Sequence, residues 1–189
     1  MDNLIIEGNL CFDFSGCSLL YAPIKFDKKN PGGMTGVDFI AETSDCLYFI
    51  EVKDFQNPSA SDKQKTADYQ MLIAAAKEKK SRSATQIEDK LSYEMGRNFC
   101  LGIGLKIKDS LLRKYAMGEA ISKSVVYIFV LNMDNLGENE RGFLKSKINN
   151  GYIPTGLNAD EFSNFSEINF DLVNARQLKS YGIVCSAIS

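Results

Sequence analysis

The chain has 189 residues, which predicts one domain spanning 1–189, long enough to bury a core without disulfides or a structural metal. Hydrophobic residues make up 44% and charged residues 24%, values that are ordinary for a globular protein. The formal net charge of −2 excludes a protein that is basic over its whole surface, so any contact with nucleic acid has to come from a local group of lysines and arginines.

The N-terminal third predicts mainly strands. Residues 3–14, "NLIIEGNLCFDF", hold short apolar pieces that fit either a strand or the start of a helix, and residues 16–27 predict a short helix or turn that ends near Pro23. Residues 28–34, "KKNPGGM", are a loop by composition. Two apolar strands rich in β-branched and aromatic residues are then predicted at Gly36–Thr43 and Cys46–Asp54.

Two helices are predicted next. The apolar spacing indicates a helix over 62–80 and a longer helical region over 85–117, which we expect to be interrupted near Gly102 and Gly104. Within the second region, the stretch "KIKDSLLRKY" is predicted to be an amphipathic helix that packs on the sheet with its lysines outside.

The C-terminal third alternates strand and helix signals. Residues 123–134 form an apolar run that is typical of a buried strand, and a helix is predicted over 139–151. After a loop-like stretch come a strand over 167–173, a short helix over 175–182 and a last strand over 183–188. This order of elements predicts an α/β fold with a mixed central sheet.

The stretch "GVDFIAETSDCLYFIEVKDF" sets three charged residues into the two predicted strands. If the strands form a hairpin with Ser44 and Asp45 at its tip, paired residue numbers sum to 89. Because strand side chains alternate between faces, Asp38, Glu51 and Lys53 then point the same way. The opposite face is apolar, made by Val37, Phe39, Ala41, Tyr48, Ile50 and Val52.

This geometry places Asp38 directly opposite Glu51. Two carboxylates across a strand pair destabilise the sheet unless a cation lies between them. Lys53 offsets part of the repulsion, and a divalent ion would do so better. Ligation by oxygen alone suits magnesium or manganese rather than zinc, and the chain has no histidine.

The aspartate of "GVD", followed by "FIEVK", resembles the PD-(D/E)xK phosphodiesterase superfamily, the restriction-endonuclease-like fold. The resemblance implies a mixed central sheet flanked by helices. It also implies that Asp38, Glu51 and the backbone carbonyl of Val52 hold Mg²⁺ or Mn²⁺, and that Lys53 positions or activates the attacking water. The implied activity is metal-dependent hydrolysis of nucleic-acid phosphodiesters, with DNA as the expected substrate, by a nuclease whose catalytic residues are Asp38, Glu51 and Lys53.

Two further residues are candidates through the same resemblance. Many members carry an acidic residue on an early helix, for which Glu7 is the candidate here, and some carry a glutamine on the helix after the Glu-x-Lys strand, which would be Gln70. Val37 stands where the family name has proline. The basic run "KEKKSR" at 77–82 favours the solvated end of a helix over a phosphate site.

The sequence is also compatible with two other hypotheses for the function. One is a catalytically inactive binding or scaffolding module that keeps the nuclease fold, as part of a defence or mobile-element system. The other is a plain mixed-sheet domain in which the Glu-x-Lys pair has no function. With no second recognisable domain, a partner or a homo-oligomer would supply specificity.

The cysteines and the N-terminus bear on location. Five cysteines without a Cys-x-x-Cys spacing predict structural thiols in a reducing compartment. The N-terminal residues lack the basic region and apolar run of a signal peptide, and no window approaches ~18 apolar residues. We therefore expect a cytoplasmic protein that does not enter a membrane.

Overall fold

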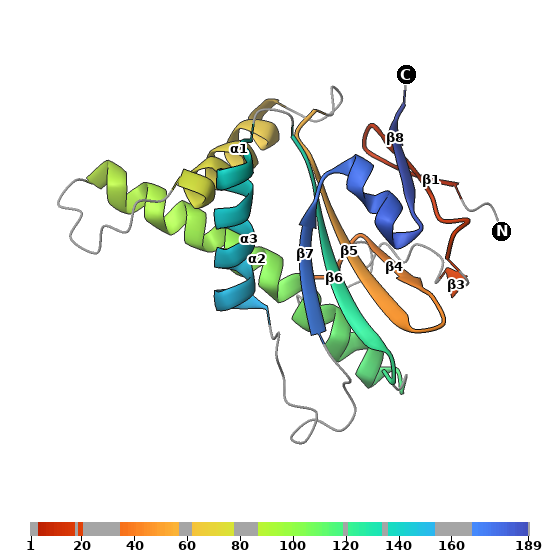
Figure 1. Cartoon of the computed structure of the whole chain (residues 1–189). Coiled ribbons are helices and arrows are strands. Elements are labelled where there is room, and N and C mark those ends of the chain that lie inside the picture. Colours follow the sequence, from red (N-terminus) through yellow and green to blue (C-terminus); the bar gives the residue numbers. More distant parts are fainter. Residues whose placement is uncertain are drawn as a thin grey trace.

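The computed structural model describes residues 4–17, 19–20, 35–56, 62–77, 87–118, 121–133, 136–153 and 168–188. The fold is mixed α/β, as the order of elements predicted. A central sheet lies between a layer of helices on one face and a small second sheet with a short helix on the other (Figure 1). None of the helices in the described ranges is long and apolar enough to cross a membrane.

The central sheet has five strands in the order β3-β4-β5-β6-β7. β3, β4 and β5 pair antiparallel, whereas β5, β6 and β7 pair parallel, so the predicted mixed sheet is confirmed. The long central strands are almost wholly buried because both faces are covered. The strand bounds are β3 Leu19–Leu20, β4 Phe39–Glu42, β5 Cys46–Asp54, β6 Ser124–Asn132 and β7 Ile168–Val173.

The second sheet joins the two ends of the described chain. β1 (Leu4–Glu7) pairs with β2 (Leu10–Asp13), and β2 pairs with β8 (Val184–Ala187), all antiparallel. Residues 4–7 and 10–13, which fitted either a strand or the start of a helix, are thus strands. In the stretch 16–27, where a short helix or turn was predicted, Leu19 and Leu20 form strand β3 instead, and residues 21–27 lie outside the described ranges. The short helix predicted over 175–182 is a 3-10 helix, η2 (Ala175–Tyr181), which ends at Gly182 in the left-handed conformation that glycine favours (φ +76°).

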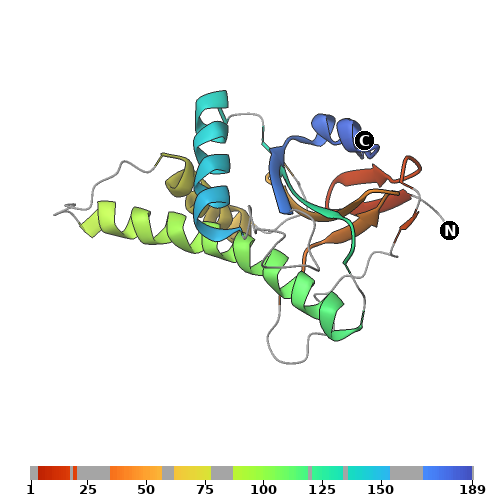
Figure 2. The ribbon, with the colours of Figure 1, turned by 60° about the horizontal axis from the view of Figure 1, so that its bottom comes forward.

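The helices cover the other face of the central sheet. They are α1 (Asp62–Lys77), α2 (Ile87–Ala116) and α3 (Glu138–Tyr152). Figure 2 shows α2 running along the sheet and past it, with α3 crossing it. Gly96 lets α1 approach closely, because a Cβ at Gly96 would lie 2.8 Å from the Ala75 Cα.

The predicted interruption of α2 near Gly102 and Gly104 is wrong, because α2 is continuous over 30 residues. Each glycine weakens a helix by about 1 kcal/mol, but the neighbouring Ile103 and Ile107 are buried against the sheet, and that packing outweighs the loss.

The β4–β5 hairpin has the predicted register. Phe39 pairs with Ile50 and Ala41 with Tyr48, and the Thr43 amide donates to the Cys46 carbonyl at 2.9 Å across the tip. One part of the prediction is wrong. Val37 does not share the face of Phe39 but packs in the cluster that faces the helices, because it precedes β4 and strand alternation does not reach it.

Some predictions fall outside the described residues, namely the loop over 28–34, the basic run beyond residue 77 and most of the loop after α3. All five cysteines carry free thiols.

Candidate functional site

Glu51 is the centre of the site. It lies near the carboxyl end of β5 on the face that meets the helices, and its side chain is fully buried. Its Oε1 accepts a hydrogen bond from Nζ of Lys106, a residue of α2, at 2.7 Å, and Nζ of Lys53 lies 3.8 Å from the same oxygen. The other oxygen, Oε2, is buried and has no hydrogen-bond partner within the described part of the chain.

Asp38 lies just before β4, beside Glu51 in the hairpin register. Its Oδ2 accepts a hydrogen bond from the Val52 amide at 2.7 Å, which fixes the carboxylate against the strand that carries Glu51. Since Oδ2 is engaged in this bond, Oδ1 is the oxygen that would be offered to a ligand.

Two residues of α2 hold the segment that leads into Asp38. The Ser110 hydroxyl accepts from the Val37 amide at 3.1 Å and donates to the Lys106 carbonyl at 2.8 Å. The preceding residue, Asp109, accepts hydrogen bonds with its carboxylate from both the amide and the hydroxyl of Thr35, at 2.7 and 3.1 Å. The helix therefore positions Asp38 through its backbone and faces Glu51 with Lys106.

The electrostatics of the site favour added positive charge. Burial and the neighbouring Asp38 raise the pKa of Glu51 to about 8, although Lys106 and Lys53 act in the opposite direction. Burial also raises the pKa of Asp38, against the opposing effects of Lys106, the Val52 amide and Lys53, and the charge of Glu7 adds to the increase. The pKa values of both carboxyls therefore stay raised, because the two lysines offset only part of the effect of burial.

These observations fit a divalent cation. An orphaned, fully buried carboxylate oxygen and a second carboxylate beside it are the hard oxygen ligands that Mg²⁺ and Mn²⁺ prefer. Across the described ranges, no three His, Cys, Asp or Glu side chains form a group that could hold a metal ion by themselves. Mg²⁺ commonly keeps several waters and takes one or two carboxylates, a number that Asp38 and Glu51 supply.

The predicted residues come together only in part. Asp38, Glu51 and Lys53 share one face, as the register predicted; Asp38 raises the pKa of Glu51 and Lys53 lowers it. The Val52 side chain faces the opposite cluster while its amide binds Asp38, and the role of its carbonyl stays a prediction.

The two additional candidates differ. Glu7 is close enough to raise the pKa of Asp38, but it lies at the end of strand β1 and not on an early helix, where many members of the family carry their acidic residue. Gln70 lies on α1 as expected, with an exposed side chain.

Lys106, Asp109 and Ser110 are the site residues that sequence reasoning missed. The lysines of this stretch were predicted to lie outside, which is wrong for Lys106 and for the buried Lys114. One signal was available: Lys106 lies three residues after Ile103 and four before Ser110, on the stripe of α2 that is buried against the sheet. A lysine on a buried helical stripe needs an anionic partner.

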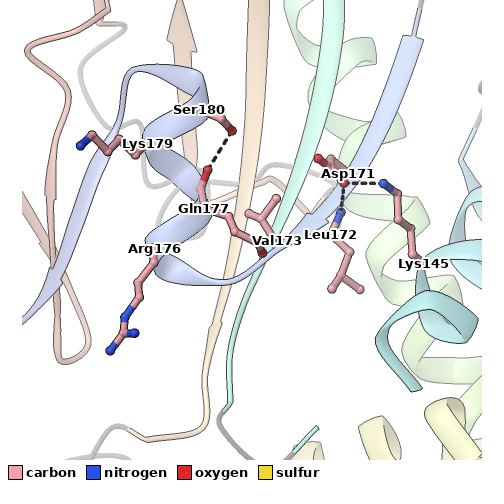
Figure 3. A pocket seen from close by; sticks show the side chains of 8 residues that line it. All are labelled: Lys145, Asp171, Leu172, Val173, Arg176, Gln177, Lys179 and Ser180. Atoms are coloured by element: carbon pink, nitrogen blue, oxygen red, sulfur yellow. Dashed lines mark hydrogen bonds and ion pairs between the residues drawn. The ribbon is translucent and has the colours of Figure 1, made fainter. Parts of the chain in front are cut away.

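A separate pocket of about 720 Å³ lies between α3, β7 and η2 (Figure 3). Asp171 accepts hydrogen bonds there from Lys145 and from the Tyr181 hydroxyl, and despite its burial these bonds lower the pKa of Asp171. Arg176 and Lys179 also line the pocket but point away from Asp171 and from one another, so these cations do not converge on one ligand position.

No family model, no curated protein and no solved structure matches this chain.

Proposed function

We propose that this protein is a metal-dependent nuclease that hydrolyses phosphodiester bonds of nucleic acid, with a restriction-endonuclease-like fold and a site of PD-(D/E)xK type. The observation that carries the proposal is the state of Glu51: a fully buried carboxylate, beside Asp38 and two lysines, with one oxygen lacking a hydrogen-bond partner among the described residues. A buried, undercompensated carboxylate destabilises a fold, so its presence favours a functional role.

The chain's own residues have distinct tasks in this proposal. Asp38 and Glu51 would hold Mg²⁺ or Mn²⁺, which when bound lowers the pKa of a water and polarises the phosphate. The Val52 amide orients Asp38. Lys53 has a side chain that is 31% exposed while its ammonium stays 3.8 Å from Glu51, so it can donate to a water or a phosphate oxygen at the mouth of the site.

The test is manganese-dependent cleavage of supercoiled DNA, linear DNA, single-stranded oligonucleotides and RNA. We expect cleavage that falls by roughly 10²–10³-fold in Lys53→Ala, because a positioned donor to the reacting groups is lost. Lys108→Ala is the matched control, since Lys108 is an exposed lysine of α2. Cleavage that survives Lys53→Ala unchanged would contradict the proposal and indicate a contaminating enzyme.

One observation favours a second candidate, a non-catalytic binding or scaffolding module with the same fold. The Lys106 ammonium already gives Glu51 a cation from within the chain. Calorimetry with MnCl₂ separates the two candidates: the nuclease binds Mn²⁺ and loses this binding in Asp38→Asn, whereas the module has no need to bind it.

A further inference from the structure

The cation nearest to Glu51 does not come from the Glu-x-Lys strand. Lys106 reaches in from α2 and places Nζ 2.7 Å from Glu51 Oε1, while Nζ of Lys53 lies at 3.8 Å. Glu51 and Lys106 are 55 positions apart in sequence, so only the packing of α2 on the sheet brings them together. The Lys106 ammonium is thus the main counter-ion of Glu51.

The Lys106 ammonium and a divalent cation would compete for the Glu51 carboxylate, so each weakens the binding of the other. A cation shared by Asp38 and Glu51 would lie close to the Lys106 ammonium, and like charges repel strongly at short range in a poorly solvated site. The Lys106 side chain can turn toward solvent, because it is 21% exposed and its long flexible stem can carry the ammonium to water.

We propose that Lys106 is an internal counter-ion that holds the metal-free site together and is released from Glu51 when a divalent cation binds. This inference rests on the proposed metal-dependent function. Lys106 then has two effects: it stabilises the metal-free fold, and it lowers the affinity for the metal by competing for the same carboxylate. Ser110 reinforces the first effect, since its hydroxyl joins the Lys106 carbonyl to the Val37 amide.

The first experiment labels the lysines of the wild-type protein with an acylating reagent, with and without saturating MnCl₂, and measures each site by mass spectrometry. We expect Lys106 labelling to rise roughly three- to fivefold with Mn²⁺, because the side chain goes from one-fifth exposed to fully exposed. Exposed Lys108 and buried Lys114, both on α2, are internal controls that should not change, and a rise at Lys114 would indicate unfolding instead.

Calorimetry on the same samples separates the possible failures. If Mn²⁺ binds and Lys106 labelling stays level or falls, the counter-ion inference is overturned and the proposed nuclease stands. If Mn²⁺ does not bind at millimolar concentration, both are overturned.

A variant gives a second, independent readout. Lys106→Met keeps the length of the side chain and removes its charge, so in EDTA the melting temperature should fall by roughly 6–10 °C. Mn²⁺ should then restore most of this loss and stabilise Lys106→Met more than it stabilises the wild type or Lys108→Met. An equal or smaller Mn²⁺ effect in Lys106→Met contradicts the inference.

The double variant Glu51→Gln/Lys106→Met controls for folding. It removes both charges, and we expect it to fold in EDTA and to be insensitive to Mn²⁺. If Lys106→Met is too unstable to purify in EDTA, recovery of folded protein only when Mn²⁺ is present supports the inference, and failure with Mn²⁺ present overturns it.

Discussion

The two faces of the β4–β5 hairpin differ sharply although they share the same backbone. One face is apolar through Phe39, Ala41, Tyr48, Ile50 and Val52 and packs on the small sheet. There the centroid of the Phe39 ring lies 5.1 Å from that of Phe12 and 5.6 Å from that of Phe14. The other face is apolar at Leu47 and Phe49 but becomes charged at Glu51 and Lys53, toward the carboxyl end of β5.

The difference separates stability from function within one element. Burying aromatic and branched side chains stabilises the fold, whereas burying Glu51 destabilises it unless cations compensate. A sheet built for stability alone would continue the apolar pattern to the end of the strand. The charged end is therefore the part of the hairpin for which stability gives no explanation.

The largest effect is expected from breaking the apolar face. Phe39→Ala removes a ring that is 1% exposed and should lower the free energy of unfolding by about 3–5 kcal/mol, measured by urea denaturation. Phe143→Ala, at a residue that is 37% exposed on α3, should change it by less than ~1 kcal/mol. Similar values for the two variants would mean that the aromatic cluster is not the stabilising face.

The charged face is tested by pH. The folded pKa of Glu51, about 8, lies above the ordinary glutamate pKa of 4.5, so the folded state binds the proton more tightly than the unfolded state. The stability contributed by this proton is present below about pH 4.5 and is lost as pH rises through 8. In EDTA the wild type should therefore lose roughly 4 kcal/mol over this window relative to Glu51→Gln.

Urea denaturation at pH 5, 6.5 and 8 measures this difference, because the titration of groups remote from Glu51 is shared by both proteins. The difference between Glu51→Gln and wild type should grow with pH and shrink when Mn²⁺ replaces EDTA. Parallel stability profiles for the two proteins would rule out an undercompensated carboxylate at this position.

A smaller effect sharpens the comparison by loosening only the support of the charged face. Ser110→Ala leaves the buried Val37 amide without its acceptor and should cost about 1–2 kcal/mol of stability. Because Asp38 follows this segment, the affinity for Mn²⁺ should also fall, by roughly tenfold. Ser122→Ala, at an exposed serine, is the control and should change neither quantity. An unchanged affinity in Ser110→Ala would show that Asp38 is placed without α2.

Local patterns predicted much of the hairpin. The alternation of apolar residues predicted the bounds of β5. A short turn at Ser44 and Asp45 predicted the pairing register, in which the numbers of paired residues sum to 89. Period-two geometry then placed Asp38, Glu51 and Lys53 on one face. These features depend on residues close in sequence, which is why the sequence carries them.

The rest of the site depends on packing between distant segments. Lys106 bonds to Glu51 on β5, and Asp109 and Ser110 bond to the segment before β4, so these contacts join residues 55 to 74 positions apart. The helical period places Lys106 on the buried stripe of α2, but no local period identifies the partners. Val37 lies before β4, where strand alternation no longer applies. The continuity of α2 through its glycines was decided by tertiary packing, which overrides helix propensity.

The clamp between α2 and the Thr35–Val37 segment has a consequence for how the protein folds. The hairpin pairs residues close in sequence and can close early, whereas the Thr35–Asp109 bond closes a loop of 74 residues and loses far more chain entropy. The Thr35–Val37 segment therefore reaches its place only after α2 has docked, whereas the Val52 amide can hold Asp38 within the hairpin. The pairing of Glu51 with Lys106 is a late product of folding, and a nascent chain that has not yet released α2 from the ribosome carries β4 and β5 without the clamp and without Lys106.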